Sequence, residues 1–224
     1  APELPPASGL AAVLADPGTH PLRRIALLAA DLAARHRAHG RDGAAMEAEL
    51  ETLRRVRQAL GDEDDRVRIR QHLETRLLDL DAADPWWSLA QWQRARFLQQ
   101  EKAPDHLVRA HLAASRGRDR HPDSIGGQLC AAVIQEIEAP RVTLRAMTAD
   151  APGRRTIAIA HRNLGRLSLR AWRWDLAARW DEDQTLPDDA GMKAMIRDDP
   201  PDLTWAVDLP ATDDFAQHRT WTGL

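Results

Sequence analysis

The chain has little cysteine, with one residue, Cys130, in 224 positions. A single thiol cannot close an internal disulfide or supply the clustered thiolates of a structural zinc site. Tyrosine is absent and lysine is rare, because all but two of the 31 basic residues are arginine. The formal net charge is −3 at pH 7. No basic excess therefore marks the chain as a nucleic-acid-binding protein, and we expect no nucleic-acid partner.

Long apolar runs are also missing. The longest apolar stretch, around Ile25 to Ala34, is interrupted by Asp31. It is shorter than the roughly 20 residues that a membrane-spanning helix requires. No positively charged segment followed by an apolar one opens the sequence as given, so no signal peptide is recognised in it. We expect no membrane span.

The common catalytic motifs are absent as well. The sequence has no Gly-x-Ser-x-Gly elbow, no phosphate-binding glycine loop and no His-Glu-x-x-His pair. We interpret His36 and His39 as solvated residues at a helix end and Cys130 as a buried structural thiol. The acidic run 62–65 lacks calcium-loop spacing and suits a helix N-terminus, and Gly126-Gly127 is a very weak phosphate signal. We therefore predict no catalytic, cofactor-binding or metal-binding residue, no cofactor and no enzyme activity.

The character of the sequence changes once, near Ala139-Pro140. Before it, apolar residues recur at the spacing of a helix; after it, apolar and polar residues alternate with period two. This predicts an α+β, multidomain chain. Its parts are an N-terminal extension over 1–20, a helical-hairpin domain over 21–139 and a β domain over 140–224.

Six amphipathic helices are expected in the first part. They are predicted from Pro21 to His39, from Asp42 to Gly61, from the acidic run 62–65 to Leu80, from Pro85 to Leu98, from Asp105 to Leu112, and after Asp123 or Ser124 to Ile137. Residues 117–122 are expected to form a charged connection. The predicted buried stripes include Ile25, Leu28 and Leu32, and Leu107, Val108 and Leu112. Short connections predict antiparallel hairpins, a degenerate tetratricopeptide-like array.

The second part predicts antiparallel strands around 142–146, 157–159, 167–171, 205–209 and 218–224. A tight hairpin is expected at Asn163-Leu164-Gly165 and a turn at Pro152-Gly153. Segment 181–199 reads as irregular, with one helical turn around Met192 to Ile196. About 85 residues follow Pro140, close to the roughly 100 of a β-sandwich. We expect an antiparallel β-sandwich that is incomplete and continues in a longer chain.

Motifs across this boundary resemble a known family. The first set reads His121-Pro122-Asp123-Ser124, Gly126, Cys130, Ile134, Ile137 and Pro140. The second reads His161-Arg162-Asn163-Leu164, Leu167, Leu169, Arg170 and Arg173, and the third Phe215, His218, Arg219 and Thr220. In this order they resemble the junction between the helical region and the first macroglobulin-like sandwich of bacterial alpha-2-macroglobulin-like proteins. The similarity covers residues 85–224 at the level of motifs.

The resemblance implies a place in an endopeptidase inhibitor of the periplasm or cell envelope. Such proteins trap proteases, and some use a Cys-x-Glu-Gln thioester. Here Cys130 is followed by Ala131-Ala132-Val133, so that thioester is not present and no functional residue is carried over. The resemblance thus implies a non-catalytic N-terminal scaffold. Its expected partners are the rest of a longer parent chain, target proteases and other envelope proteins.

An alternative rests on the tryptophans. Trp86, Trp87 and Trp92 cluster at the start of one predicted helix. Packing in the core is one use for them. The other is a groove lined by Trp and Arg, because stacked helical hairpins often bind peptides. The alternative function is therefore an independent helical-repeat module for protein–protein interaction.

Overall fold

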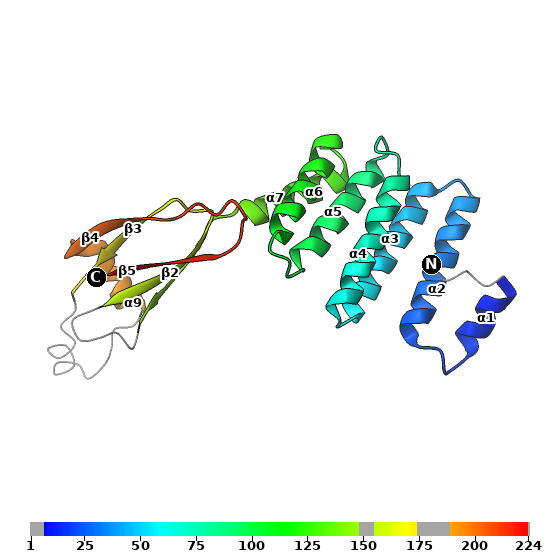
Figure 1. Cartoon of the computed structure of the whole chain (residues 1–224), viewed down its shortest axis with the longest axis horizontal. Coiled ribbons are helices and arrows are strands. Elements are labelled where there is room, and N and C mark those ends of the chain that lie inside the picture. Colours follow the sequence, from blue (N-terminus) through cyan, green and yellow to red (C-terminus); the bar gives the residue numbers. More distant parts are fainter. Residues whose placement is uncertain (1–6, 148–154, 174–188, 224) are drawn as a thin grey trace. The chain divides into compact units, whose positions relative to one another are not determined.

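The computed structural model describes residues 7–147, 155–173 and 189–223 (Figure 1). The chain divides into two compact units, Ala1–Glu138 and Ala139–Leu224. The described part of the first unit is helical, and that of the second contains antiparallel strands and one helix. The chain is therefore α+β.

All six predicted helices are present, and a further short helix precedes them. The helices of the first unit are α1 (Ala7–Ala15), α2 (Pro21–Ala38), α3 (Asp42–Ala59), α4 (Glu63–Asp79), α5 (Pro85–Gln99), α6 (His106–Arg120) and α7 (Ile125–Glu138). Helix α1 lies within the predicted extension 1–20. Its nine residues are too few for an apolar period to be read.

Local side chains fix several of the helix ends. The Asp62 carboxylate accepts hydrogen bonds from the backbone N–H groups of Asp64 and Asp65, so the acidic run caps α4 as predicted. Asp84 caps α5 ahead of a proline in the first turn, and Ser124 Oγ accepts from Gly127 N at 3.0 Å. After α2, Gly40 has φ +66, a backbone conformation that glycine adopts without strain.

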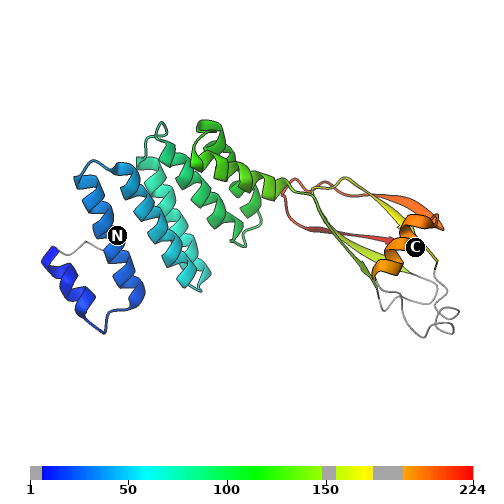
Figure 2. The same cartoon turned by 180° about the vertical axis from the view of Figure 1, so that it is seen from behind.

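The helices stack in an ordered array (Figures 1 and 2). Helix α5 contacts both α3 and α7, whereas α4 contacts α3 and α5, and α6 contacts α5 and α7. One core cluster joins α3, α4 and α5. Its buried members are Met46, Leu50, Leu73, Leu77, Ala90 and Phe97.

The predicted buried stripe of α6 is wrong. Val108 and Leu112 are about half exposed, and the buried residues are Ala110, Ala113, Ala114 and Gly117. Small side chains let α6 approach its neighbours closely. A Cβ at Gly117 would lie 2.5 Å from Cys130 Sγ. The predicted connection over 117–122 is also wrong in its first part, because α6 continues through Gly117 to Arg120.

The predicted buried stripe of α2 is also wrong in part. Leu28 and Leu32 are about half exposed and Ile25 is at the limit of exposure, while Leu27 and Ala33 are buried. Alanines occupy much of this helix, so an apolar period alone does not identify which face is covered. Helix α2 packs mainly against α3, and its buried face includes Leu27 and Ala33.

The described strands of the second unit form two small sheets. They are β1 (Arg141–Ala146), β2 (Thr156–Arg162), β3 (Arg166–Ala171), β4 (Leu203–Asp208) and β5 (His218–Gly223), with α9 (Asp189–Asp198) preceding β4. One sheet has the order β1-β2-β5 and the other pairs β3 with β4, all antiparallel. Buried Ile159 of β2, Leu169 of β3 and Leu209, which follows β4 directly, form one cluster.

The predicted hairpin at 163–165 is wrong. Strands β2 and β3 belong to different sheets, so Asn163-Leu164-Gly165 carries the chain from one sheet to the other. Asn163 does adopt a positive φ of 55. Its N–H donates to Thr212 Oγ1 at 2.8 Å. This partner, 49 positions further along the chain, holds the connection between the two sheets in place.

Other predictions for this unit have mixed outcomes. Helix α9 is longer than the single turn expected around Met192 to Ile196. The turn at Pro152-Gly153 and the segment 181–188 lie outside the described residues. Among the helices that the structure describes, none combines the length and the apolar character needed to cross a membrane.

Candidate functional site

Helix α4 borders two grooves of the helical unit. The first groove, with a volume of about 390 Å³, lies between α2 and α4 over α3. Its floor is apolar and includes Leu27, Ala30, Ala33, Met46, Leu50 and Leu73. On its rim, Glu49 pairs with Arg37 and, at 3.3 Å, with Arg76. The lining thus places the carboxylate of Glu49 beside three arginines, Arg23, Arg37 and Arg76.

The second groove has a volume of about 520 Å³ and lies on the other side of α4. Helices α4 and α6 border it, and α5 contributes the floor. Its lining includes Leu77, Leu78, Trp87, Gln91, Arg94 and Arg116. The two grooves occupy equivalent places in the array, because each lies between successive helices of the series α2, α4 and α6. Both volumes fall in the range typical of ligand pockets.

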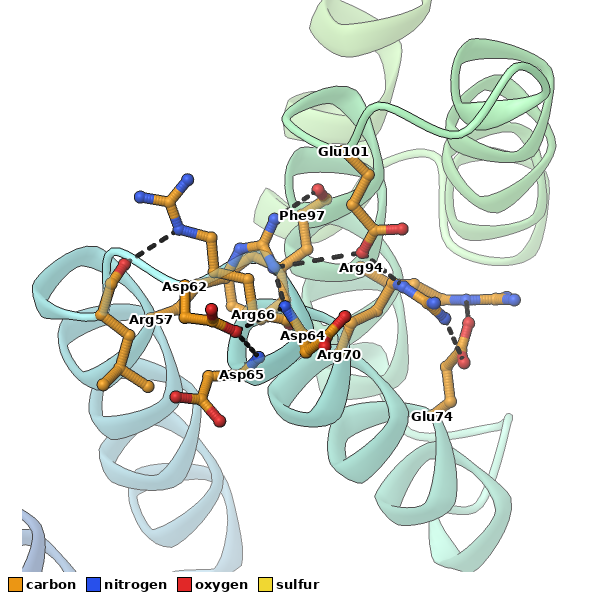
Figure 3. A network of polar contacts seen from close by, with 11 residues as sticks. Arg57, Asp62, Asp64, Asp65, Arg66, Arg70, Glu74, Arg94, Phe97 and Glu101 are labelled. Carbon is orange, nitrogen blue, oxygen red and sulfur yellow. Dashed lines mark hydrogen bonds and ion pairs between the residues drawn. The ribbon is translucent and has the colours of Figure 1, made fainter.

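A buried arginine holds the helices beside the grooves together (Figure 3). Arg57 of α3 is 2% exposed. Its guanidinium donates to the carbonyl oxygens of Arg66 and Phe97, each at 2.7 Å, and lies 4.6 Å from the centroid of the Phe97 ring. Burial lowers the pKa of Arg57, and the nearby Glu101 carboxylate opposes that effect.

A second arginine extends the cluster into the second groove. Arg70 Nε donates to Glu101 Oε1 at 2.6 Å, and Arg70 Nη1 to Glu74 Oε2 at 2.6 Å. Arg94 donates to the other oxygen of Glu74 at 2.8 Å. We name Arg57, Arg70, Glu74, Arg94 and Glu101 the arginine cluster (Figure 3). Because its hydrogen bonds connect α3, α4, α5 and Glu101, which lies two positions after the end of α5, its first role is to fix their spacing.

The three neighbouring tryptophans do not share one groove. Trp86 and Trp87 pack against the core cluster, and Trp87 also borders the second groove. Trp92 lines a separate cavity of about 210 Å³, together with Arg54 and Arg96. Tryptophan and arginine thus meet in two of the described cavities, one bordered by α4, α5 and α6 and the other by α3 and α5.

Cys130 lies in the helical core and is fully buried. Its Sγ lies 3.5 Å from the carbonyl oxygen of Ser88. Burial raises the pKa of the thiol to about 12, against a small opposing effect of Arg118. At neutral pH the side chain is therefore a thiol, which is not a nucleophile.

We expect native Cys130 to resist alkylation. A pKa near 12 leaves about 10³-fold less thiolate than an exposed cysteine has. Iodoacetamide labelling followed by mass spectrometry checks this, with the urea-unfolded chain as the control. Equal labelling rates in the folded and unfolded chain would contradict the buried position.

The remaining sequence candidates have structural roles. His39 Nδ1 lies 2.7 Å from the carbonyl oxygen of Arg35 at the end of α2. Gly126 and Gly127 permit close helix contacts, since a Cβ at Gly126 would lie 2.3 Å from Leu89 N. Within the ranges that the structure describes, no group of three metal-ligating side chains comes together.

One polar cluster in the second unit was not predicted. His161 of β2 is fully buried and lies opposite His218 of β5, with ring centroids 6.3 Å apart. His218 Nε2 lies 2.9 Å from Asp214 Oδ1, and Thr220 Oγ1 lies 3.4 Å from His161 Nε2. His161 follows Ile157 and Ile159 at period two, which is the signal that places it on the inner face of the strand.

The stability of the second unit should fall as the pH falls below about 6.5. Burial, and then the charge of His218, lower the pKa of His161 from 6.5. Protonation of His161 therefore favours the unfolded chain. The contribution of His161 to the free energy of unfolding is complete above pH 6.5 and decreases as the pH falls toward the lower pKa of the folded state. The pKa of Asp214 is also lowered, by the Ala216 N–H and by His218, and its contribution is lost only below its usual value of 3.8.

Hydrogen–deuterium exchange of β2 at a series of pH values measures this effect. In His161→Leu, the loss of protection of β2 between pH 6.5 and the lower pH range in which carboxyl groups titrate should disappear. The same decline in that variant would show that another group is responsible.

Comparison with protein-family models, with curated proteins and with solved structures finds no match for this chain.

Proposed function

We propose that this chain is a non-catalytic scaffold, the N-terminal portion of a bacterial alpha-2-macroglobulin-like endopeptidase inhibitor of the cell envelope. The observation that carries the proposal is the meeting of two motifs that are far apart in sequence. His161 lies opposite His218 in the sheet, and Thr220 contacts the His161 ring. Residues that carry the family resemblance thus serve one another as structural partners, as expected of a fold signature rather than a catalytic site.

The architecture of the second unit supports a β-sandwich reading. Ile159 from one sheet and Leu169 from the other belong to a single buried cluster. Trp205 and Val207 of β4 pack against the same cluster. Apolar residues from two antiparallel sheets that face a shared core are the defining feature of a sandwich.

The helical unit supports a degenerate tetratricopeptide-like reading. Its helices have 14 to 18 residues from α2 to α7, and short loops join them. Helices α5, α6 and α7 contact one another as a triplet, and α3, α4 and α5 repeat that arrangement. Repetition of one contact pattern along the chain is typical of stacked helical hairpins.

The reading frame that encodes this chain gives the first test. We expect it to continue into further sandwich domains, and a stop codon directly after Leu224 would overturn the proposal. The parent protein, incubated with an endopeptidase, should block cleavage of casein but not of a small fluorogenic peptide. The isolated 224-residue chain should block neither. Protection of casein by the isolated chain would contradict its role as a scaffold.

The second candidate function is an independent module for protein–protein interaction. The observation that favours it is the pair of grooves on either side of α4. The larger of the two contains Trp87, Arg94 and Arg116, and this combination supports the proposal of a groove lined by Trp and Arg. Both candidates agree that the chain itself is not an enzyme.

A further inference from the structure

Gln91 is a buried amide at the floor of the second groove. The residue is 4% exposed, and its Oε1 has no hydrogen-bond partner. No hydrogen bond joins its amide nitrogen to another residue of the described ranges. Buried polar groups in folded proteins are almost always hydrogen-bonded, so this amide requires an explanation. An amide offers donors and an acceptor side by side, the pattern that matches the main chain of a peptide.

An exposed leucine stands on the edge of the same groove. Leu78 of α4 is 86% exposed, the highest value among the large apolar residues that the structure describes as exposed. Leu77 and the partly buried Trp87 line the groove next to it. Exposed apolar side chains at a crevice mark interaction surfaces, and tryptophan is enriched among the residues that contribute most to binding.

The charges of the second groove favour an anionic ligand. Its carboxylate, Glu74, is bound by Arg70 at 2.6 Å and by Arg94 at 2.8 Å. Arg116 is exposed and forms no ion pair with any residue in the described part of the chain. The unmatched charge of the groove is therefore positive. A guanidinium binds a carboxylate through two parallel hydrogen bonds.

We propose that the second groove binds a peptide segment of a partner protein in which an acidic side chain lies close to a large apolar one. The main-chain amide of the peptide bonds with Gln91, the apolar side chain covers Leu78 and Trp87, and the carboxylate pairs with Arg116. This inference rests on the second candidate function and specifies its ligand. The described lining of the first groove differs, because it includes no tryptophan and no buried side-chain polar atom that lacks a hydrogen-bond partner.

A phage-displayed library of random short peptides, selected on the full chain, tests the proposal. We expect the enriched peptides to carry Asp or Glu near Leu, Ile, Phe or Trp. A fluorescein-labelled synthetic copy then gives a Kd by fluorescence anisotropy. Leu78→Ala and Arg116→Glu should each weaken binding about tenfold. Both side chains are exposed, so neither change disturbs the core.

Gln91→Leu separates binding from folding. It should weaken binding about tenfold while the thermal midpoint stays equal or rises, because it removes a buried polar group without a partner. His72→Ala, an exposed residue of the first groove, is the matched control and should bind normally. Loss of binding in His72→Ala alone would overturn the inference but keep the interaction module. Failure to enrich any peptide would overturn both.

Discussion

Replacing Glu101 by leucine is expected to lower the free energy of unfolding by about 3–5 kcal/mol. Glu101 is 6% exposed and accepts a hydrogen bond from Arg70 at 2.6 Å. It also lies 4.0 Å from the Arg57 guanidinium. Removing it leaves the buried Arg57 cation without a carboxylate and Arg70 with Glu74 alone, and the low polarity around the two cations makes that arrangement costly.

Urea unfolding monitored by far-UV circular dichroism measures this loss. The matched control is Glu136→Leu, since Glu136 is half exposed and also pairs with an arginine, Arg96, at 2.8 Å. Exposed ion pairs contribute about 0–1 kcal/mol, so the control should change little. Equal losses in the two variants would mean that Arg57 and Arg70 find other partners when Glu101 is absent.

The second large effect is expected for Gly126→Ala. A Cβ at this position would lie 2.3 Å from the backbone N of Leu89 and 2.6 Å from the carbonyl carbon of Ser88. Backbone atoms cannot rotate away as a side-chain tip can. Helix α7 must therefore move away from α5, and we expect a loss of about 3 kcal/mol or more in the free energy of unfolding.

Gly61→Ala is the control for the glycine experiment. Nothing lies within 4 Å of a Cβ at Gly61, so the change should stay within about 0.5 kcal/mol. Comparison of the two midpoints in urea isolates the effect of close helix contact from the effect of glycine on the unfolded chain. A Gly126→Ala midpoint equal to that of Gly61→Ala would contradict the tight α5–α7 contact.

Helix positions were predictable because each signal was local. Pro21, Asp62 and Pro85 sit at the starts that their side chains favour, and Gly40 follows the end of α2. Helix faces were harder to predict. In α6 the covered face is made of alanine and Gly117, and the larger Val108 and Leu112 turn outward. How closely two helices approach depends on both partners, and this information is not contained in one segment.

The sequence contains a pattern that indicates the arginine cluster, but a search restricted to apolar residues does not detect it. Met46, Leu50, Leu53 and Arg57 follow one helical stripe at spacings of four, three and four. An arginine on a buried stripe must find acceptors inside the protein. The carboxylate of Glu101 lies far along the chain, so the stripe could indicate a buried cation but not its partner.

The strands, like the helices, could be located from local patterns, but their partners could not. Period two placed β1 to β5 close to their observed bounds, but it does not specify which strand pairs with which. A local turn signal at Asn163-Leu164-Gly165 suggested a hairpin. The bond from Asn163 N to Thr212 Oγ1 joins segments 49 positions apart and directs the chain to the other sheet instead.

The pairing of β2 with β5 has a consequence for biosynthesis. Thr156 pairs with Gly223 and His161 with His218, so this ladder closes only after the last of these strands has left the ribosome. Helices α2 to α7 contact near neighbours in sequence, and contacts of that kind form early. The helical half can therefore reach its native form on the nascent chain before β5 is available to pair with β2. During that interval the unpaired edge of β2 can pair with a strand of another chain, whereas the helical unit is already folded and can bind a partner.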